Sequence, residues 1–587
     1  MNAVPATDPS DISTSTPTST VPLSLPRQSA ARPGLRTASW TLGVMALLVG
    51  AGAGLGSVAF RWLITTFTHL LSGHADYADA GHAANGHVPW LGPYFVLLAP
   101  VVGGLLYGPL VDRFAKEARG HGVPEVMLAV AKRGGRINPQ VSVVKALASA
   151  LCIGSGGSVG REGPIVQIGS ALGSTAGRLA RVSEHRMRLL VACGAAGGIA
   201  ATFNAPLAGV FFAMELILRD FAVEAFAAVV LSSVTAGVIG RAAFGNTPFL
   251  VLPPFHVDHV AQFPLFALLG GLAGAAGVGF TRILYLVEDA CDWAWRGPEW
   301  LRPAVGGLLL GVLLLALPEM YGVGYPVLEK AVHGGYLPAF LLLLLIGKVF
   351  ATSLTIGIGG SGGVFAPSLF IGAMLGAAYG NAAHQLLPGT AGTTGAYALV
   401  GMGAVFAGAS RAPITATVIL FELTGEYTII LPLMLAVVLA TVTSRLLSRD
   451  TIYTLKLRRR GIDITAPAPQ FGGKHVSAVM ENPPDPLPAA TELTDAVERL
   501  HMPGNGVLPV VSASGRFLGT IDACQVTQAL ADGADDDLEP PPTAGQIAVL
   551  TAHVTADMPL SAAVAVLAST PGTPVPVLDP GDHHLVG

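Results

Sequence analysis

Apolar stretches fill most of the chain between about residues 40 and 450. Some are long and continuous, and others are shorter and interrupted by Gly and Pro. Backbone that is not helical at membrane depth is tolerated only where it is buried in protein or lines a cavity. The pattern therefore predicts an all-α polytopic membrane domain whose broken helices are the first place to look for a binding site. Long stretches, near the roughly 20 residues that a spanning helix needs, lie at 41–71, 91–110, 223–245, 261–286, 302–318, 336–356 and 428–447. Shorter stretches, interrupted by Gly and Pro, lie at 141–154, 163–180, 188–202, 364–378 and 396–409.

The apolar region repeats itself. Pro206 precedes an apolar run that ends at Glu215, and Pro413 precedes an equally long run that ends at Glu422. A glycine-rich break lies upstream of each run. Two structural repeats, expected to be inverted as in many transporters, are predicted at roughly 38–250 and 260–450.

The composition supports a membrane protein and excludes some functions. Of 587 residues, 51% are hydrophobic and 12% are charged, whereas soluble domains are about 25% charged. The net charge of −4 gives no basic surface for nucleic acid. The four cysteines are scattered and predict neither a disulfide framework nor a zinc site.

The two ends of the membrane domain, predicted at 38–460, carry positive charge. Residues 1–37 are rich in Ser, Thr, Pro and Ala and are predicted to be disordered. Because basic residues flank cytoplasmic membrane ends, both termini are expected in the cytoplasm, with an even number of crossings. These basic residues are Arg27, Arg32 and Arg36 before the first span, and Lys456, Arg458, Arg459 and Arg460 after the last.

After a linker at 461–475, the composition changes to charged residues, Pro and short β-like runs. Residues 476–530 predict the order strand, helix, strand, strand, helix. Residues 544–587 begin the same order again, with Leu585-Val586-Gly587 matching Phe517-Leu518-Gly519. A small α/β domain over 476–587 is expected, with a truncated second copy.

Three Gly- and Pro-containing breaks each precede a predicted helix: Gly120–Glu125, Gly160–Pro164 and Gly362–Pro367. A helix N-terminus offers free N–H groups and a positive dipole end. Several such ends aimed at one point form an anion site. Such a site contains no full positive charge, and a full charge would hold the anion too tightly to release it. A single break would indicate only a kink, but three breaks together with the internal repeat predict a conduction path.

Glu162 lies in one of these breaks, and a carboxylate within a membrane segment marks a functional site by default. When ionised it has the charge of a halide, so it can occupy an anion site and leave on protonation. The alternative role for Glu162 is a salt bridge with Arg161.

Other chemistries find little support. Gly357-x-Gly-x-x-Gly362 matches a dinucleotide fingerprint by letter, but it follows an apolar span rather than a strand of a βαβ unit. No nucleophile–base pair or metal cluster stands out, so an enzyme is not expected. A membrane-anchored nucleotide sensor would not need Glu162 in a broken helix.

Gly-Arg-Glu-Gly-Pro164, Gly-Val-Phe-Ala-Pro367, Phe203-Asn-Ala-Pro206 and Tyr453 resemble the signatures of the CLC family of chloride channels and chloride/proton antiporters over about 40–460. The resemblance implies a homodimer in a bacterial inner membrane, with one chloride pathway per subunit. It assigns Glu162 as the gate, Lys145 and Arg161 as electrostatic residues, and the anion contacts to His121, Gly163, Val364, Phe365 and Tyr453.

Two positions depart from the family pattern. His121 stands where the family usually has a serine whose hydroxyl contacts the anion, so its imidazole could instead tune anion preference with pH. Leu216 stands where antiporters usually have a second acid that relays protons inward. Leu216 favours a channel slightly, and a chloride/proton antiporter remains the alternative.

The tail resembles a pair of CBS modules, which often bind adenine nucleotides. In the stretch that would hold the nucleotide, Asp522 replaces a hydroxyl residue and Gln525 replaces the acid expected on the ribose. Nucleotide binding is therefore not expected, and no other cofactor is implied.

Overall fold

The computed structural model describes residues 33–246, 259–464, 475–500, 506–535, 542–570 and 574–587. The chain divides into two compact units, Met1–Ile464 and Thr465–Gly587, which are described separately. Disorder is predicted for residues 1–37, of which 1–32 lie outside the described residues and 33–37 form the start of a helix instead. Helix α1 begins at Pro33, five positions before the predicted start of the membrane domain. Proline is favoured at the first position of a helix because its fixed φ suits that conformation.

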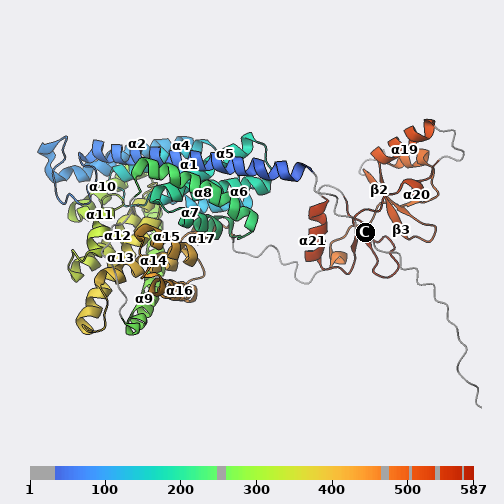
Figure 1. Cartoon of the computed structure of the whole chain (residues 1–587). Helices are drawn as coiled ribbons and strands as arrows, with labels where there is room; N and C mark the ends of the chain where they lie inside the picture. The colour runs from blue at the N-terminus through green and yellow to red at the C-terminus, as the bar shows by residue number, and fades with distance from the viewer. Residues whose placement is uncertain (1–32, 247–258, 465–474, 501–505, 536–541, 571–573) are drawn as a thin grey trace, which may run out of the picture. The chain divides into compact units, whose positions relative to one another are not determined.

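The first unit is all-helical in its described residues (Figure 1). Its α-helices are α1 (Pro33–Ser72), α2 (Phe95–Phe114), α3 (Val123–Lys132), α4 (Gln140–Gly154), α5 (Glu162–Leu179), α6 (Glu184–Phe203), α7 (Pro206–Phe212), α8 (Val223–Phe244), α9 (Phe263–Ala294), α10 (Arg302–Ala316), α11 (Tyr325–Val332), α12 (Pro338–Gly357), α13 (Phe365–Leu386), α14 (Thr394–Ser410), α15 (Pro413–Thr424), α16 (Ile430–Leu447) and α17 (Thr454–Arg459). The shorter helical segments are η1 (Pro89–Tyr94), η2 (Lys116–Ala118), η3 (Ala213–Leu218), η4 (Val260–Gln262) and η5 (Pro318–Met320).

Within the described ranges, seven helices are long and apolar enough to cross a membrane. Two of the predicted apolar stretches differ in length from the helices observed there. The stretch at 188–202 belongs to a 20-residue helix, α6, because the helix extends back through polar residues to Glu184. The stretch at 302–318 is shorter than predicted: α10 ends at Ala316, and Pro318 opens the separate turn η5.

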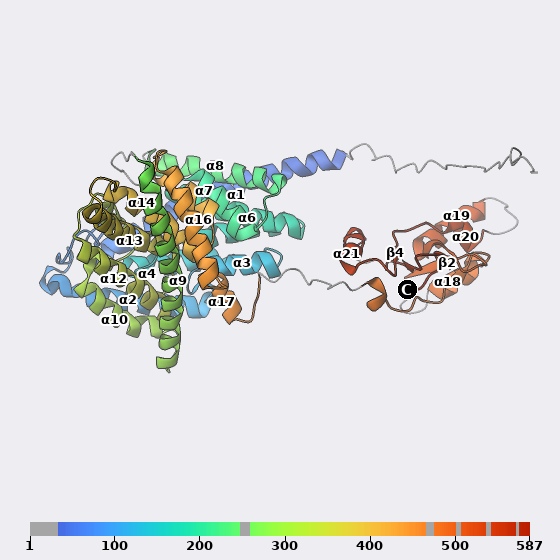
Figure 2. The ribbon, with the colours of Figure 1, turned by 90° about the horizontal axis from the view of Figure 1, so that it is seen from below.

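The two halves of the unit repeat the same helix contacts. Helix α1 packs against α4, α6 and α8, and α9 packs against α12, α14 and α16. Likewise α5 packs against α6, and α13 against α14. Figure 2 shows α9 and α16 running side by side. Helices α7 and α15, which occupy equivalent places in the two halves, contact each other.

Glycine sets the close spacing of α5 on α6 and of α13 on α14. A Cβ added to Gly169 would lie 2.1 Å from the carbonyl oxygen of Gly194. A Cβ added to Gly372 would lie 2.3 Å from the carbonyl oxygen of Gly401. Small residues let backbones approach where helices associate in membranes. The abundant glycine of the sequence therefore packs the broken helices against their neighbours.

Part of the predicted linker belongs to the helical unit. Ile462 and Ile464 pack against its core. The Ile464 carbonyl accepts a 3.0 Å hydrogen bond from the Arg219 guanidinium. Residues 465–474 of the predicted linker lie outside the described residues.

The second unit is a small α/β structure. Its first half contains β1 (Leu487–Pro488), α18 (Leu493–Leu500), β2 (Val507–Val511), β3 (Phe517–Asp522) and α19 (Ala523–Asp535). Its second half contains α20 (Ala544–Ile547), β4 (Val554–Thr555), α21 (Leu560–Ser569) and β5 (Val577–Leu578), and the unit also has η6 (Val476–Ala478). Strand β2 pairs in parallel with β1 and antiparallel with β3, while β4 and β5 pair in parallel. The predicted order of elements in 476–530 is confirmed. Leu585 forms a bridge with Leu578 of β5, as expected for the start of a second copy.

Candidate functional site

The three glycine-rich breaks meet at one place in the first unit. The Gly120 N–H donates to the Gly360 carbonyl at 3.1 Å, and the Gly362 N–H donates to the Gly120 carbonyl at 3.3 Å. Gly160 and Gly363 exchange two further backbone hydrogen bonds, of 2.8 and 2.6 Å. These bonds satisfy backbone groups that would otherwise be unpaired inside the protein. They bring together the start of α3, the start of α5 and the start of α13.

Glycine is required where these segments touch. A Cβ added to Gly163 would lie 1.9 Å from the His121 carbonyl oxygen and 3.0 Å from the Gly363 Cα. Gly122 has φ +83°, a conformation that only glycine adopts freely, and its own Cβ position would lie 2.7 Å from the Gly163 carbonyl oxygen. Gly163 therefore holds the first turn of α5 against the segment that precedes α3.

Glu162, the first residue of α5, is buried at this junction, with 1% of its surface exposed. Its Oε1 accepts a 2.7 Å hydrogen bond from the Tyr325 hydroxyl at the start of α11. Its Oε2 accepts a 3.3 Å hydrogen bond from the Ala366 N–H in the first turn of α13. The carboxylate of this first-half residue is thus held by two donors from the second half, a hydroxyl of α11 and an N–H in the first turn of α13.

The other predicted anion contacts lie in the same region. Val364 and Phe365 are buried at the start of α13. The Phe365 ring packs against Phe203 and Phe406. Tyr453, just before α17, is also buried. Val364 and Phe365 directly precede Ala366, whose N–H donates to Glu162, so the structure places these two residues at the same junction.

His121 is buried in the segment between Gly120 and Gly122, with 1% of its surface exposed. Its ring stacks on Tyr285 of α9, with ring centroids 6.1 Å apart. Neither ring nitrogen has a hydrogen-bond partner among the described residues. A buried polar group without a partner carries a desolvation cost that a bound ligand or water can remove.

Two buried lysines tie the site together. The Lys145 ammonium on α4 donates to the carbonyls of Ala118 and Gly120, at 2.8 and 2.7 Å, and so fixes the segment that carries His121. The Lys348 ammonium on α12 donates to the Ser158 hydroxyl, at 2.9 Å, and to the carbonyls of residues 322 and 323. Lys145 therefore holds the His121 segment, while Lys348 holds the equivalent segment in the second half.

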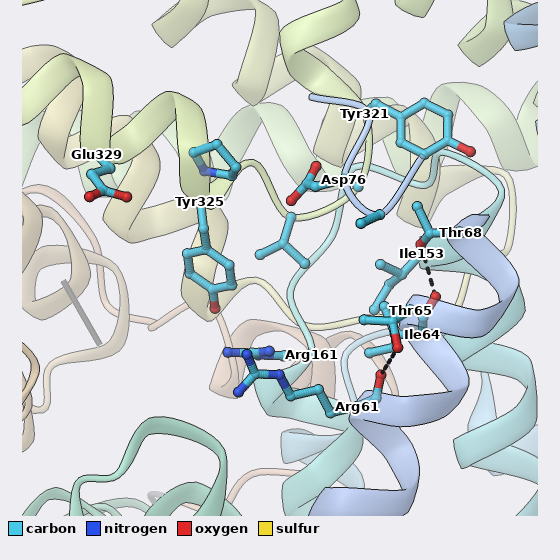
Figure 3. Close-up of a pocket in the computed structure, with 14 residues that line it drawn as sticks. Arg61, Ile64, Thr65, Thr68, Asp76, Ile153, Arg161, Tyr321, Tyr325 and Glu329 are labelled. Atoms are coloured by element: carbon cyan, nitrogen blue, oxygen red, sulfur yellow. Dashed lines mark hydrogen bonds between the residues drawn. The ribbon is translucent and has the colours of Figure 1, made fainter. Parts of the chain in front are cut away.

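A cavity of about 280 Å³ lies above the junction, lined by residues that include Arg61, Asp76, Arg161, Tyr321, Tyr325 and Glu329 (Figure 3). Arg161, the residue before α5, lies 5.0 Å from the centre of the Tyr325 ring. Figure 3 shows the Tyr325 hydroxyl pointing towards Arg161, with Arg61 beside it and Glu329 directed away. Arg161 directly precedes Glu162, and its positive charge favours the ionised form of the Glu162 carboxyl group.

Leu216 is buried in η3, a π-helix that continues from α7. The neighbouring Glu215 faces the other half of the unit. Its carboxylate accepts hydrogen bonds from the N–H groups of Ile414 and Thr415, at 3.2 and 2.8 Å, at the start of α15. Glu422 on α15 in turn accepts hydrogen bonds from two N–H groups at the start of α7, at 3.0 and 2.7 Å. Both acids therefore cap helices.

The sequence contains a signal for Tyr325 and Lys348 that the search for Gly-Pro breaks missed. Gly322-Val-Gly-Tyr-Pro326 repeats the pattern of Gly120-His-Gly-Val-Pro124. Lys348 follows its proline at nearly the same distance as Lys145 does. A position-by-position comparison of the halves would have identified Tyr325 as a residue at a helix start beside the site.

In the tail, Asp522 and Gln525 occupy the positions at which the CBS resemblance would place nucleotide contacts, and they bond to each other. The Asp522 N–H donates to the Gln525 side chain at 2.9 Å, and the Gln525 N–H donates to the Asp522 carboxylate at 2.8 Å. This reciprocal pair is a capping box at the start of α19. Among the residues that the structure describes, no cluster of three or more His, Cys, Asp or Glu side chains could hold a metal ion.

Comparison with known proteins agrees with the geometry. The profile of the family described as "Voltage gated chloride channel" matches residues 103–445. A Ralstonia nicotianae protein named "Putative chloride channel protein ClcB-like" is 38% identical over 71% of this chain and 96% of its own length. The "H(+)/Cl(-) exchange transporter ClcA" of Vibrio cholerae is 35% identical over 71% of this chain and 88% of its own length.

A solved structure of a slow cyanobacterial Cl−/H+ antiporter matches 71% of this chain and 97% of its own chain, with a TM-score of 0.65 and 28% identity. The profile covers more than half of the chain, and the relatives span most of their own length. The helix breaks, the buried glutamate and these comparisons lead to one conclusion: the chain belongs to the CLC family and is a multi-pass membrane protein of chloride transport rather than an enzyme.

Proposed function

We propose that this protein exchanges chloride for protons and that Glu162 is the gate through which the two are coupled. The observation that carries the proposal is the position of the Glu162 carboxylate. It is buried in the first half and accepts an O–H and an N–H donor from the second half. A carboxylate and a chloride ion compete for such donors because both are anions. Protonation removes the charge of Glu162, so the anion replaces the side chain as the proton is picked up.

The relatives support exchange over passive conduction. The printed name of the Vibrio cholerae relative and the printed title of the cyanobacterial structure both describe proton exchange. The sequence prediction of a channel depended on Leu216 alone. In an exchanger, protons would reach Glu162 from the inner side without a carboxylate at position 216. Water that enters the pathway is the carrier we propose.

A passive anion channel is the second candidate. It is favoured by the buried alkyl side chain of Leu216 and by Glu215, whose carboxylate is occupied in capping α15. Protons crossing a membrane need groups that can hold them, since bare charge in hydrocarbon is costly. The first relative in the comparison carries a channel name.

We also propose His121, Gly163, Val364, Phe365 and Tyr453 as the anion contacts, with Lys145 and Arg161 raising the local potential. The protein is proposed to form a homodimer in a bacterial inner membrane, with both termini in the cytoplasm. The tail is proposed to be a CBS pair with a structural role. The capping box that engages Asp522 and Gln525 supports the absence of a bound nucleotide.

The gate is tested by chloride efflux from proteoliposomes at a series of pH values. Glu162→Gln copies the protonated carboxyl group, so we expect chloride efflux that persists and no longer depends on pH. Glu329→Gln is the matched control, because this acid lines the same cavity but is exposed. Wild-type pH dependence in Glu162→Gln would reject Glu162 as the gate.

A further inference from the structure

The Glu162 carboxylate contacts Tyr325, which follows a segment that has no role among the predicted site residues. Gly322, Val323 and Gly324 precede α11, and the two glycines have positive φ values of 61° and 87°. Lys348 holds this segment through hydrogen bonds to its carbonyls. The segment is therefore built as rigidly as its counterpart around His121, and it places Tyr325 at the start of α11.

Tyr325 makes the shorter of the two hydrogen bonds to Glu162. Its hydroxyl is 2.7 Å from Oε1, whereas the Ala366 N–H is 3.3 Å from Oε2. The Arg161 guanidinium lies over the Tyr325 ring at 5.0 Å from its centre, which orients the ring by a cation–π contact. Hydrogen bonds to a charged acceptor are shorter and stronger than those between neutral groups. Tyr325 is thus the main donor to the Glu162 carboxylate that the structure describes.

We propose that Tyr325 is a positioning residue that holds the ionised Glu162 carboxylate in the closed pathway. The inference rests on the proposed role of Glu162 as the gate. The Tyr325 hydroxyl stabilises the closed position only while Glu162 is ionised, since a protonated carboxyl group is a weaker acceptor. Removing the hydroxyl weakens the closed, ionised state relative to the protonated, released state. Less acid is then needed to open the pathway.

The other charged and titratable groups around Glu162 are the same in wild type and in a variant that lacks only the Tyr325 hydroxyl. Apart from Tyr325 itself, the charged and titratable side chains that interact with Glu162 or line the cavity beside it are Arg61, Asp76, Arg161, Tyr321, Glu329, Lys348 and Tyr453. Each is present in both wild type and a Tyr325 variant. A change in the pH dependence of efflux therefore reports the Tyr325 hydroxyl.

The test is a double-mutant cycle on chloride efflux from proteoliposomes between pH 4 and pH 8. Tyr325→Phe keeps the ring and removes the hydroxyl. We expect the pH of half-activation of efflux to rise by about 1 unit, the size of effect given by one hydrogen bond to a charged group. In the Glu162→Gln background the same substitution should leave efflux unchanged, because the ionised acceptor is gone.

Tyr321→Phe is the matched control. Tyr321 lines the same cavity, but its hydroxyl donates to the Gly154 carbonyl at 2.7 Å rather than to Glu162. The pH dependence of chloride efflux in Tyr321→Phe should equal that of wild type. Folding is checked by size-exclusion chromatography. Efflux is also measured in native membrane vesicles, so that a variant with low detergent stability is still tested.

Equal pH profiles for wild type and Tyr325→Phe would overturn the proposal. So would a difference that persists in the Glu162→Gln background, because Tyr325 would then act on another group. If instead Glu162→Gln keeps the wild-type pH dependence, the proposed gate itself fails. That outcome is distinguished by the single Glu162→Gln variant.

Discussion

Replacing His121 with alanine tests whether its imidazole contacts the transported anion. Both ring nitrogens are buried and lack a partner among the described residues, so a donor is available in the pathway. A hydrogen bond to a charged group contributes about 1.5–3 kcal/mol, and each 1.4 kcal/mol changes affinity tenfold. His121→Ala should therefore weaken chloride binding by roughly tenfold or more, as measured by isothermal titration calorimetry on the purified protein.

His121→Ser supplies the matched comparison, because serine returns a single hydroxyl donor. It should recover part of the chloride affinity and change the ratio of chloride to nitrate flux. Tyr285→Phe serves as the control: it keeps the ring on which His121 stacks and removes a hydroxyl that donates to the Ile452 carbonyl. Wild-type chloride affinity in His121→Ala would refute the reasoning and leave the anion to backbone N–H groups alone.

Two further predictions concern structure and the tail. Glu215→Ala and Glu422→Ala should each lower the free energy of unfolding by about 1–3 kcal/mol, since each leaves N–H groups at a helix start without an acceptor. Melting temperatures in detergent check this, with Glu329→Ala as the exposed control, and unchanged values would contradict the capping role. ATP should show no saturable binding to the full-length protein by calorimetry, because Gln525 is engaged in a capping box. Micromolar binding would contradict this expectation.

The membrane fold could be predicted from the sequence because apolar length and Gly-Pro breaks are local signals. The ends of the spans were predicted less well. Helix α6 begins in a polar segment at Glu184, which a search for apolar residues leaves out. Helix α10 ends at Ala316, and Pro318 begins the next turn. The motif around Glu162 identified the site, and the spacing of the breaks indicated that they meet. The bonds that join Gly120 and Gly160 to the second half are long-range and needed the structure.

Partners of the site residues were the part that local patterns could not supply. Tyr325 lies far from Glu162 in sequence, and only the folding of α11 against α5 and α13 brings them together. The direction of Glu215 was equally beyond local patterns, because it lies in a π-helix and its carboxylate is held by the N–H groups of α15.

The central claim, proton-coupled chloride exchange through Glu162, is tested most directly by proton movement in proteoliposomes with a chloride gradient and no initial pH gradient. The account predicts that chloride drives protons uphill at a fixed ratio in wild type. It also predicts that Glu162→Gln abolishes this proton movement while chloride still flows. Chloride flux in wild type without any proton movement would contradict exchange and establish a passive channel, as Leu216 alone would indicate.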